Sequence, residues 1–440
     1  MDRREFLKTS AAVVAASRTA GALTPPPSDR VRLGFIGVGR QGRGLLGGFL
    51  KQREADVVVL CDVYKPSLDE ALGVIAKRDP ERRLPETAGD FRRVLDRSDI
   101  DAVVVASPDH WHALQAVMAC HAGKDVYVEK PISVTIDEGR KMVEAARKHK
   151  RIVQVGTQQR SGVHFQKAVE VVQSGRLGKI TFVRTWNYGN STPAGIGNPP
   201  DSEPPAGLDW DLWLGPAPKR PFNANRFGIA PDRWSSFRWF WDYAGGMMTD
   251  WGVHLLDIVL WAMKSAGPES VSATGGKLAL DDNRETPDTL FVTYQFPGWV
   301  CTYEHREGNA RQVEAHGYGI AFHGTDATMF VDRQGYEIFP ETRRVDNRPV
   351  PRAEADAVKT SNSHGEDHAR NFLDCMKSRQ LPICDIEIGH RSTATCHLGN
   401  IAVRTGERFR WDSAREAISD SKAAARLLAR EYRSPWKLRV

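Results

Sequence analysis

The sequence lacks the features of a protein stabilised by disulfide bonds or metal ions. Its six cysteines, at positions 61, 120, 301, 375, 384 and 396, form no CxxC pair and show no spacing typical of a zinc module. No apolar run approaches the roughly 20 residues that a membrane-spanning helix requires. We therefore expect neither a disulfide framework nor a transmembrane helix, and we interpret the cysteines as small buried apolar residues.

Neither sign of charge dominates the chain. Lys and Arg number 61 against 55 Asp and Glu, and the formal net charge of +6 is not gathered into basic blocks. Nucleic acid is therefore not an expected partner. The 440 residues are 41% apolar and 26% charged, which is close to the globular average and is enough for two or three folded domains.

The first 22 residues have the pattern of a twin-arginine signal peptide. Asp2 to Lys8 read DRREFLK, a weakly apolar run follows from Ala11 to Ala16, and Ala20-Gly21-Ala22 is an A-x-A cleavage signature. We expect residues 1–22 to be removed on export and residues 23–30 to form a spacer. The signal pattern predicts a periplasmic or exported protein. The twin-arginine route carries folded proteins, often with a cofactor already inserted.

Beyond residue 30, short apolar runs alternate with helical patterns. The predicted strands are 31–36, 57–61, 102–106, 126–129 and 152–155, and the predicted helices are 40–51, 91–95, 112–122 and 136–149. This alternation predicts an α/β domain over residues 31–156 with a doubly wound parallel sheet, the Rossmann arrangement.

The pattern changes after residue 156. Residues 181–186 and 271–331 are rich in strand-forming residues without crossover helices between them, which predicts a mainly antiparallel sheet. Helices are expected at 246–263 and 366–378, and surface loops at 190–205 and 341–363. Residues 157–440 are therefore predicted to form a second, α+β domain that binds substrate.

A glycine-rich turn indicates a dinucleotide. Residues Gly37-Val38-Gly39-Arg40-Gln41-Gly42 form a GxGxxG motif that follows a strand and opens a helix, so the phosphates would lie on the helix N-terminus. Asp62, at the end of the second strand, is placed to accept hydrogen bonds from ribose hydroxyls. A carboxylate there favours NAD over NADP, although the nearby Lys65 leaves NADP possible.

Two further segments carry candidate reactive groups. Lys130 ends a predicted strand, at the edge where open α/β sheets bind ligands. Asp250 and His254 are separated by four residues on a predicted helix, so they would share a face as a carboxylate–imidazole pair, with Asp257 one turn further on to orient the imidazole. The alternative is that the apolar residues of this helix form a core stripe while its polar residues face water.

Together these motifs resemble the Gfo/Idh/MocA oxidoreductases. The resemblance covers nearly the whole chain after residue 30 and rests on the glycine loop, Asp62, the runs SPDHWH (107–112), EKP (129–131) and QVGTQQR (154–160), and the GGxxxDxxxH run (245–254). It implies a homo-oligomer, a dimer or tetramer, that often assembles through the open sheet of the second domain. It also implies that His254 is the base, that Asp250 tunes it, and that Lys130 holds the reacting hydroxyl. The implied cofactor contacts are Ser107, Trp111, His112, Glu129, Lys130 and Gln158.

Tryptophan is concentrated where a substrate site is expected. Eight of the twelve tryptophans (186, 210, 213, 234, 239, 241, 251 and 261) lie between Trp186 and Trp261. Aromatic rings stack on sugar C–H faces but also fill cores, so we assign half of them to core or interface. The predicted substrate contacts are Trp234, Trp239 and Trp241, with Arg160, Arg233 and Tyr243 as polar partners. His110 and His112 have no acidic or cysteine partner, so no metal site is predicted.

These residues predict an NAD(P)-dependent oxidoreductase that transfers hydride between a pyranose or polyol hydroxyl and a tightly bound nicotinamide cofactor. An exported enzyme meets little free nicotinamide, which favours a reaction that restores its own cofactor. The alternative is an NAD-dependent glycoside hydrolase or lyase related to the family, in which transient oxidation at C3 permits elimination. Related N-acetylgalactosaminidases lack the lysine of the EKP triplet, so Lys130 favours the oxidoreductase. A silent binding protein is a third reading, disfavoured by the intact Lys130, Asp250 and His254.

Overall fold

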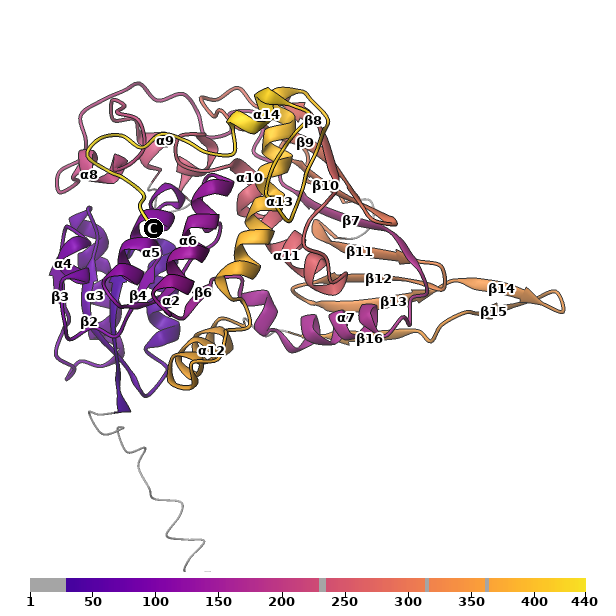
Figure 1. Cartoon of the computed structure of the whole chain (residues 1–440), viewed down its shortest axis with the longest axis horizontal. Helices are drawn as coiled ribbons and strands as arrows, with labels where there is room; N and C mark the ends of the chain where they lie inside the picture. The colour runs from indigo at the N-terminus through magenta and orange to yellow at the C-terminus, as the bar shows by residue number, and fades with distance from the viewer. Residues whose placement is uncertain (1–28, 229–234, 313–315, 361–363) are drawn as a thin grey trace, which may run out of the picture.

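The structure is a computed structural model that describes residues 29–228, 235–312, 316–360 and 364–440. Two sheets lie side by side, one built from the N-terminal part of the chain and one from its middle (Figure 1). The signal-peptide pattern of residues 1–22 lies outside the described residues, and so do Arg233 and Trp234.

The first sheet has six strands in the order β3-β2-β1-β4-β5-β6, and all neighbours pair in parallel. The strands are β1 (Val31–Ile36), β2 (Ala55–Cys61), β3 (Glu86–Ala88), β4 (Ala102–Val105), β5 (Asp125–Val128) and β6 (Val153–Val155), and the helices are α2 (Arg40–Phe49), α3 (Lys65–Arg78), α4 (Arg92–Leu95), α5 (Asp109–His121) and α6 (Ile136–Lys148). Strands buried on both faces read as continuous apolar runs, which is why the sequence predicts them well. The predicted doubly wound parallel sheet is confirmed, although α3 and β3 were not predicted.

The second sheet has nine strands in the order β16-β13-β12-β11-β7-β10-β9-β8-β17. They are β7 (Ile180–Tyr188), β8 (Ser270–Gly276), β9 (Thr289–Phe296), β10 (Trp299–Arg306), β11 (Tyr318–Gly324), β12 (Ala327–Asp332), β13 (Gly335–Pro340), β16 (Asp356–Lys359) and β17 (Phe409–Arg410). β7 and β10 pair in parallel and the other neighbours are antiparallel. The predicted mainly antiparallel sheet is confirmed.

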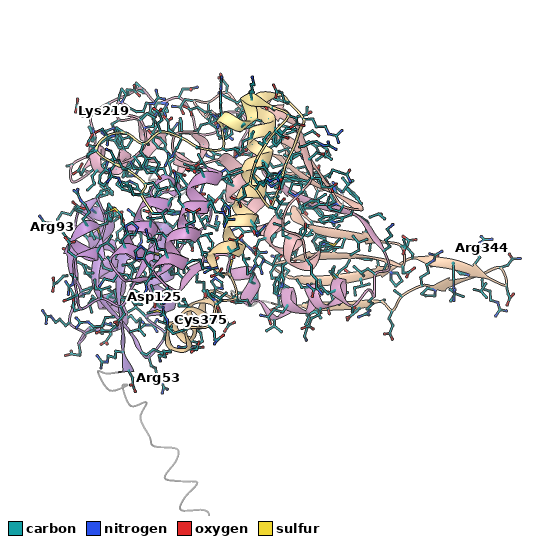
Figure 2. The ribbon with its side chains drawn as sticks, viewed as in Figure 1. Arg53, Arg93, Asp125, Lys219, Arg344 and Cys375 are labelled. Atoms are coloured by element: carbon teal, nitrogen blue, oxygen red, sulfur yellow. The ribbon has the colours of Figure 1, made fainter. Side chains whose placement is uncertain are left out.

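The prediction of a loop over residues 341–363 was wrong. This segment contains β16 and a hairpin of β14 (Thr342–Val345) and β15 (Arg348–Pro351), which we call the arm. The turn of the arm is made by Asp346 and Asn347, both with positive φ, as a two-residue hairpin turn of the primed type requires. Most of its side chains are exposed on both faces, so the sequence shows no alternation of apolar and polar residues. The arm extends away from the body, with Arg344 near its far end (Figures 1 and 2).

Helices cover one face of the second sheet and connect it to the first. They are α7 (Val163–Gln173), α10 (Gly246–Asp250), α11 (Gly252–Ala262), α12 (Gly365–Ser378), α13 (Ile386–Thr405) and the short α14 (Lys422–Arg426), with α8 (Trp210–Leu214), α9 (Ala224–Phe227) and the 3-10 turns η2 (Gln158–Ser161) and η3 (Ser236–Trp239) in the connections. The predicted helix 246–263 is divided at Trp251. Residues 190–205 hold no helix or extended strand, as predicted.

The core of the first sheet is completed from the far end of the chain. Phe372, on α12, is fully buried and meets the rings of Phe49 and Tyr127 at 6.3 Å and 5.9 Å. Figure 2 shows Cys375 of the same helix beside this domain. Trp436 packs edge-on against Trp111, 4.9 Å away. The C-terminal part of the chain therefore stabilises the first domain, because Phe372 lies between β16 and β17 in sequence and Trp436 follows β17.

The cysteine interpretation agrees with the structure. All six are buried and none is in a disulfide. Among the described residues, none of the helices has the length and apolar character needed to cross a bilayer.

Candidate active site

One large cavity, of about 1370 Å³, receives residues from both domains. The first domain contributes the glycine loop and the ends of β2, β4 and β5. The second domain contributes η3, α10, the first turn of α11 and the turn after β12. This is the carboxyl edge of the parallel sheet, where open α/β folds bind ligands.

The glycine loop leaves room for an anionic group at the start of α2. A side chain on Gly37, whose φ is +85°, would place its Cβ 2.4 Å from the backbone nitrogen of Ser107, so only glycine fits there. A Cβ on Gly39 would meet no atom within 4 Å, which leaves the backbone open to the cavity. The first turn of α2 has no acidic residue and no side-chain cap. The N-terminus of α2 therefore suits a pyrophosphate.

Asp62 is held beside this loop. Its carboxylate accepts hydrogen bonds from the backbone N–H groups of Val38 (2.8 Å) and Tyr64 (2.9 Å), and burial raises its pKa to about 6. It also lines the cavity, where a carboxylate could accept hydrogen bonds from ribose hydroxyls. Lys65 does not line the cavity, and its amine is held by Asp69. The site therefore fits NAD, and the Asp62 carboxylate itself disfavours the 2′-phosphate of NADP.

Eleven of the residues predicted to contact the cofactor line the cavity: Gly37, Gly39, Arg40, Gln41, Asp62, Ser107, Trp111, His112, Glu129, Lys130 and Gln158. Val38 and Gly42 lie behind the surface. Val38 positions Asp62, and a Cβ on Gly42 would lie 2.2 Å from the Gly37 carbonyl oxygen, so Gly42 permits close packing of α2 on the turn.

Hydrogen bonds fix the wall around Glu129. Its carboxylate accepts from the side-chain amides of Gln41 and Gln158, both at 2.9 Å, and burial raises its pKa. The two ring nitrogens of His112 lie 2.7 Å from the carbonyl oxygens of Ser107 and Pro131. His112 therefore connects the turn after β4 to the turn after β5.

Lys130 connects the two domains across the cavity. Its Nζ donates to the Asp250 carboxylate (2.8 Å) and to the Asp250 carbonyl oxygen (3.0 Å). Nε of Arg238 donates to the same carboxylate at 3.0 Å. Burial opposes ionisation of Asp250, but the two cations outweigh it and hold its pKa well below the usual range. Asp250 is therefore an anion that positions Lys130 and Arg238.

His254 lies on the same cavity wall, but the predicted Asp250–His254 pair is not formed as a hydrogen bond. The helix is interrupted at Trp251. The backbone N–H of His254 donates to the Trp251 carbonyl oxygen and not to the Asp250 carbonyl oxygen, as it would in a continuous helix. Nδ1 of His254 is buried and has no hydrogen-bond partner among the described residues. Burial, Lys130 and Arg333 lower its pKa well below 6.5, and the opposing charge of Asp250 does not compensate. The imidazole is therefore neutral at pH 7 and able to accept a proton.

Asp257 does not orient His254. Its carboxylate accepts from Nε of Arg160 (2.7 Å) and from the Ser392 hydroxyl (2.7 Å), and the Arg160–Asp257 pair is almost completely buried. The Arg160 guanidinium also lies 4.7 Å from the ring of Trp261. The prediction that Arg160 contacts substrate is corrected accordingly, because Arg160 does not line the cavity.

Of the other predicted substrate residues, Trp239 lines the cavity, and the guanidinium of Arg284 lies 4.9 Å from its ring. Trp241 does not line it, since its ring packs under Arg404 on α13 at 4.8 Å. Tyr243 is fully buried against Trp213 and Phe240. Tyr243 is therefore corrected to a core position, and Trp241 to a half-buried position against α13. Arg233 and Trp234 lie outside the described residues.

The structure adds cavity residues that the sequence did not single out. Asp109 lies in a motif that was recognised, yet its carboxylate was not assigned; burial raises its pKa to about 7. Arg238 lies within a dense run of aromatic residues. Arg333 lies in the turn between β12 and β13, where no local sequence pattern indicates a site. These residues become visible only when the second sheet is folded against the first.

The nearby histidines are structural. His110 lies 2.9 Å from the Trp213 carbonyl oxygen, and burial lowers its pKa to about 3. In the part of the chain that the structure describes, no group of three or more His, Cys, Asp or Glu is arranged to hold a metal ion.

Comparison with known proteins gives partial matches in sequence and broad matches in fold. A glycosyl hydrolase family 109 protein from Shewanella sp. (strain W3-18-1) is 29% identical over 201 residues, which are 40% of this chain and 44% of that relative. A levoglucosan dehydrogenase solved with NADH and levoglucosan has a TM-score of 0.64 and 17% identity, over 87% of this chain and 99% of that one. The WlbA dehydrogenase of Bordetella pertussis, solved with NADH and UDP-GlcNAcA, has a TM-score of 0.63 and 21% identity over the same shares.

Family models cover both domains. Residues 31–157 match the oxidoreductase family's NAD-binding Rossmann fold, and residues 161–289 and 338–438 match the C-terminal alpha/beta domain of the same family. With the NAD-binding loop and the Lys130–Asp250 pair between these two domains, the chain belongs to the Gfo/Idh/MocA family of oxidoreductases.

Proposed function

We propose that the protein is an NAD-dependent oxidoreductase that acts on a hydroxyl group of a carbohydrate, a pyranose or a polyol. The observation that carries the proposal is the placement of Lys130 and His254 on the wall of the cavity that also contains the glycine loop and Asp62. The sugar ligands named for the two dehydrogenase structures are compatible with a carbohydrate substrate.

The side chains divide the work at the reacting oxygen. His254, neutral at pH 7, accepts the proton that the hydroxyl releases. Lys130 donates a hydrogen bond to the same oxygen and stabilises the negative charge that develops on it. Asp250 holds Lys130 and Arg238 in place, which is a positioning role. Bound NAD supplies a two-electron acceptor for the alcohol carbon.

The test is to substitute Lys130 and His254 one at a time and to assay each variant with a sugar or polyol that the wild type oxidises. We expect Lys130→Met and His254→Ala each to lower turnover on the order of a hundredfold or more, because each removes a proton-transfer or charge-stabilising group. NAD affinity, measured by fluorescence titration, is expected to stay near the wild-type value. Lys167→Met, an exposed lysine on α7, serves as the control. Wild-type turnover in either active-site variant would refute the assigned roles.

A second candidate is NAD-dependent cleavage of a glycoside through transient oxidation at C3. The glycosyl hydrolase family 109 relative supports it, although that match covers less than half of either chain. The two candidates differ in net chemistry. Release of p-nitrophenol from a nitrophenyl glycoside without net NADH, and with solvent deuterium at C2 of the product, would favour cleavage. Accumulation of NADH with an intact glycosidic bond would favour the oxidoreductase.

We also propose that the protein is exported through the twin-arginine route and retains its cofactor. The support is the residue pattern of positions 2–22 together with the scarcity of free nicotinamide outside the cytoplasm. Mass spectrometry of small molecules released from native, processed protein tests this. Stoichiometric NAD(H) is expected, and an empty, unprocessed protein would contradict both parts.

Self-association belongs to the same proposal. The family resemblance implies a homo-oligomer, and the arm supplies an extended surface whose strands pair with each other. Light scattering on the full chain measures the mass directly.

A further inference from the structure

Arg333 is a cation on the substrate side of the cavity. It lies in the turn between β12 and β13, and its guanidinium is 4.7 Å from the ring of Trp251. It remains accessible to solvent within the cavity. Among the described residues, none of the carboxylates forms an ion pair with Arg333; the Asp332 carboxylate beside it lies 3.3 Å from His316 and accepts the Gln334 N–H.

The acidic groups near Arg333 are already engaged or partly neutral. Asp250 is shared by Lys130 and Arg238. Burial raises the pKa of Asp109 to about 7, which favours its neutral form. Farther along the wall, Glu366 is paired with Lys51, and burial lowers the pKa of His364 so that it is neutral. Lys130 and Arg238 therefore share the Asp250 carboxylate, and Arg333 forms no ion pair with a carboxylate of the described residues.

An uncompensated arginine in a cavity indicates an anionic ligand. The guanidinium fork matches the two oxygens of a carboxylate and binds it through two parallel hydrogen bonds. Stacking on Trp251 fixes the plane of the fork, which reduces the conformational entropy lost on binding. The Trp251 ring lies between Arg333 and His254, 4.7 Å from the guanidinium and 6.2 Å from the imidazole, so one sugar could contact both residues.

We propose that Arg333 binds the carboxylate of the substrate, so that the enzyme acts on a sugar acid, an aldonate or a uronate, rather than on a neutral sugar. The inference rests on the proposed function and specifies its substrate class. The ring hydroxyl that reacts lies at Lys130 and His254, and the acid group lies at the wall formed by β12 and β13.

The experiment compares neutral and acidic members of matched pairs, glucose with glucuronate and galactose with galacturonate, on the NAD-loaded protein. Dissociation constants are measured by titration calorimetry. We expect at least one acid to bind about tenfold tighter or more than its neutral partner, since a hydrogen-bonded charge pair contributes roughly 1.5–3 kcal/mol. Arg333→Met is expected to abolish that difference, and Arg333→Lys to retain part of it. Arg415→Met removes an exposed arginine elsewhere and is expected to change nothing.

Each outcome decides the question. If no acid binds more tightly than its neutral partner, or if Arg333→Met keeps the preference while its melting temperature and NAD affinity stay normal, the inference is wrong. Tighter binding of glucose 6-phosphate than of glucuronate would overturn the carboxylate assignment. Oxidation of neutral sugars at least as efficient as that of acids would refute the inference but leave the proposed function standing. Absence of binding and of NADH formation with every sugar tested would contradict both.

Discussion

At the scale of single residues, the reactive side chains are distinguished by which charges surround them. Asp250 has two cationic partners and is ionised, whereas His254 is next to cations and is neutral. The sequence placed these residues four positions apart and suggested that they interact as a pair. In the folded protein the same carboxylate instead serves Lys130, which comes from the other domain.

The pH dependence of kcat/KM follows from the neutral state of His254. A base works only when unprotonated, and its pKa is lowered well below 6.5, so we expect protonation of His254 to reduce kcat/KM only well below pH 6.5. Arg333→Met removes one of the cations that lower this pKa. The imidazole should then protonate at higher pH, and the acid limb should move toward neutrality. A limb that stays in place in Arg333→Met, as in the Arg415→Met control, would show that another group is being titrated.

Arg160 is expected to affect stability rather than substrate binding. Arg160→Met leaves the buried Asp257 carboxylate without its cation, which typically costs about 3–5 kcal/mol. Urea unfolding measures this loss, and KM at a temperature where the variant stays folded is expected to be unchanged. A raised KM with normal stability would restore Arg160 to the substrate site.

Sequence patterns predicted which residues react more reliably than they predicted which residues contact the substrate. The glycine loop, Asp62 and Lys130 are recognisable because their positions follow from strand ends. Trp241 and Tyr243 were assigned to the sugar site by residue type alone, yet Tyr243 is fully buried and the half-buried Trp241 packs against Arg404. Arg333 carries no local signal, since only the tertiary fold brings its turn to the cavity.

At the scale of elements, the division between α10 and α11 shapes the site. A continuous helix would use the Asp250 carbonyl oxygen for the His254 N–H. Because that N–H bonds Trp251 instead, the Asp250 carbonyl is available to Lys130. The sequence shows one apolar pattern over both helices, so periodicity alone does not reveal the break.

Helix α12 is expected to stabilise the first domain although it follows the second sheet in sequence. Phe372→Ala removes a fully buried ring that contacts Phe49 and Tyr127, and such truncations cost about 3–5 kcal/mol. We expect NAD to lose affinity in parallel as the first domain loosens. Thermal unfolding with and without NAD measures both effects. Phe372→Leu should lose much less, and a Phe372→Ala variant as stable as wild type would contradict the assigned packing.

At the scale of the whole molecule, the arm is the part least supported by its own chain. A two-stranded hairpin is marginally stable in water by itself, which supports the proposal that the arm packs against a second copy of the chain. We expect replacement of residues 343–350 by a short turn to lower the mass measured by light scattering. At dilutions where the wild type is monomeric, the melting temperature is expected to stay unchanged. An unchanged mass would show that assembly uses another surface.

The general architecture was predictable because each sheet type has its own pattern. β1 has the bounds that its apolar run predicts. The parallel direction of the six strands follows from the alternation of strands and helices along the chain. The arm and α13 were missed for opposite reasons: most arm residues are exposed, and most residues of α13 are buried, so neither shows a contrast between faces.

The packing of α12 on the first sheet has a consequence for synthesis. On the ribosome, the six-stranded sheet emerges long before the residues that fill its core, so its early form exposes the apolar surfaces of Phe49 and Tyr127. That domain reaches its native packing only after α12 has emerged and returned to it. We therefore expect nucleotide binding to follow the synthesis of α12, and the partly made chain to expose apolar surface that chaperones can shield.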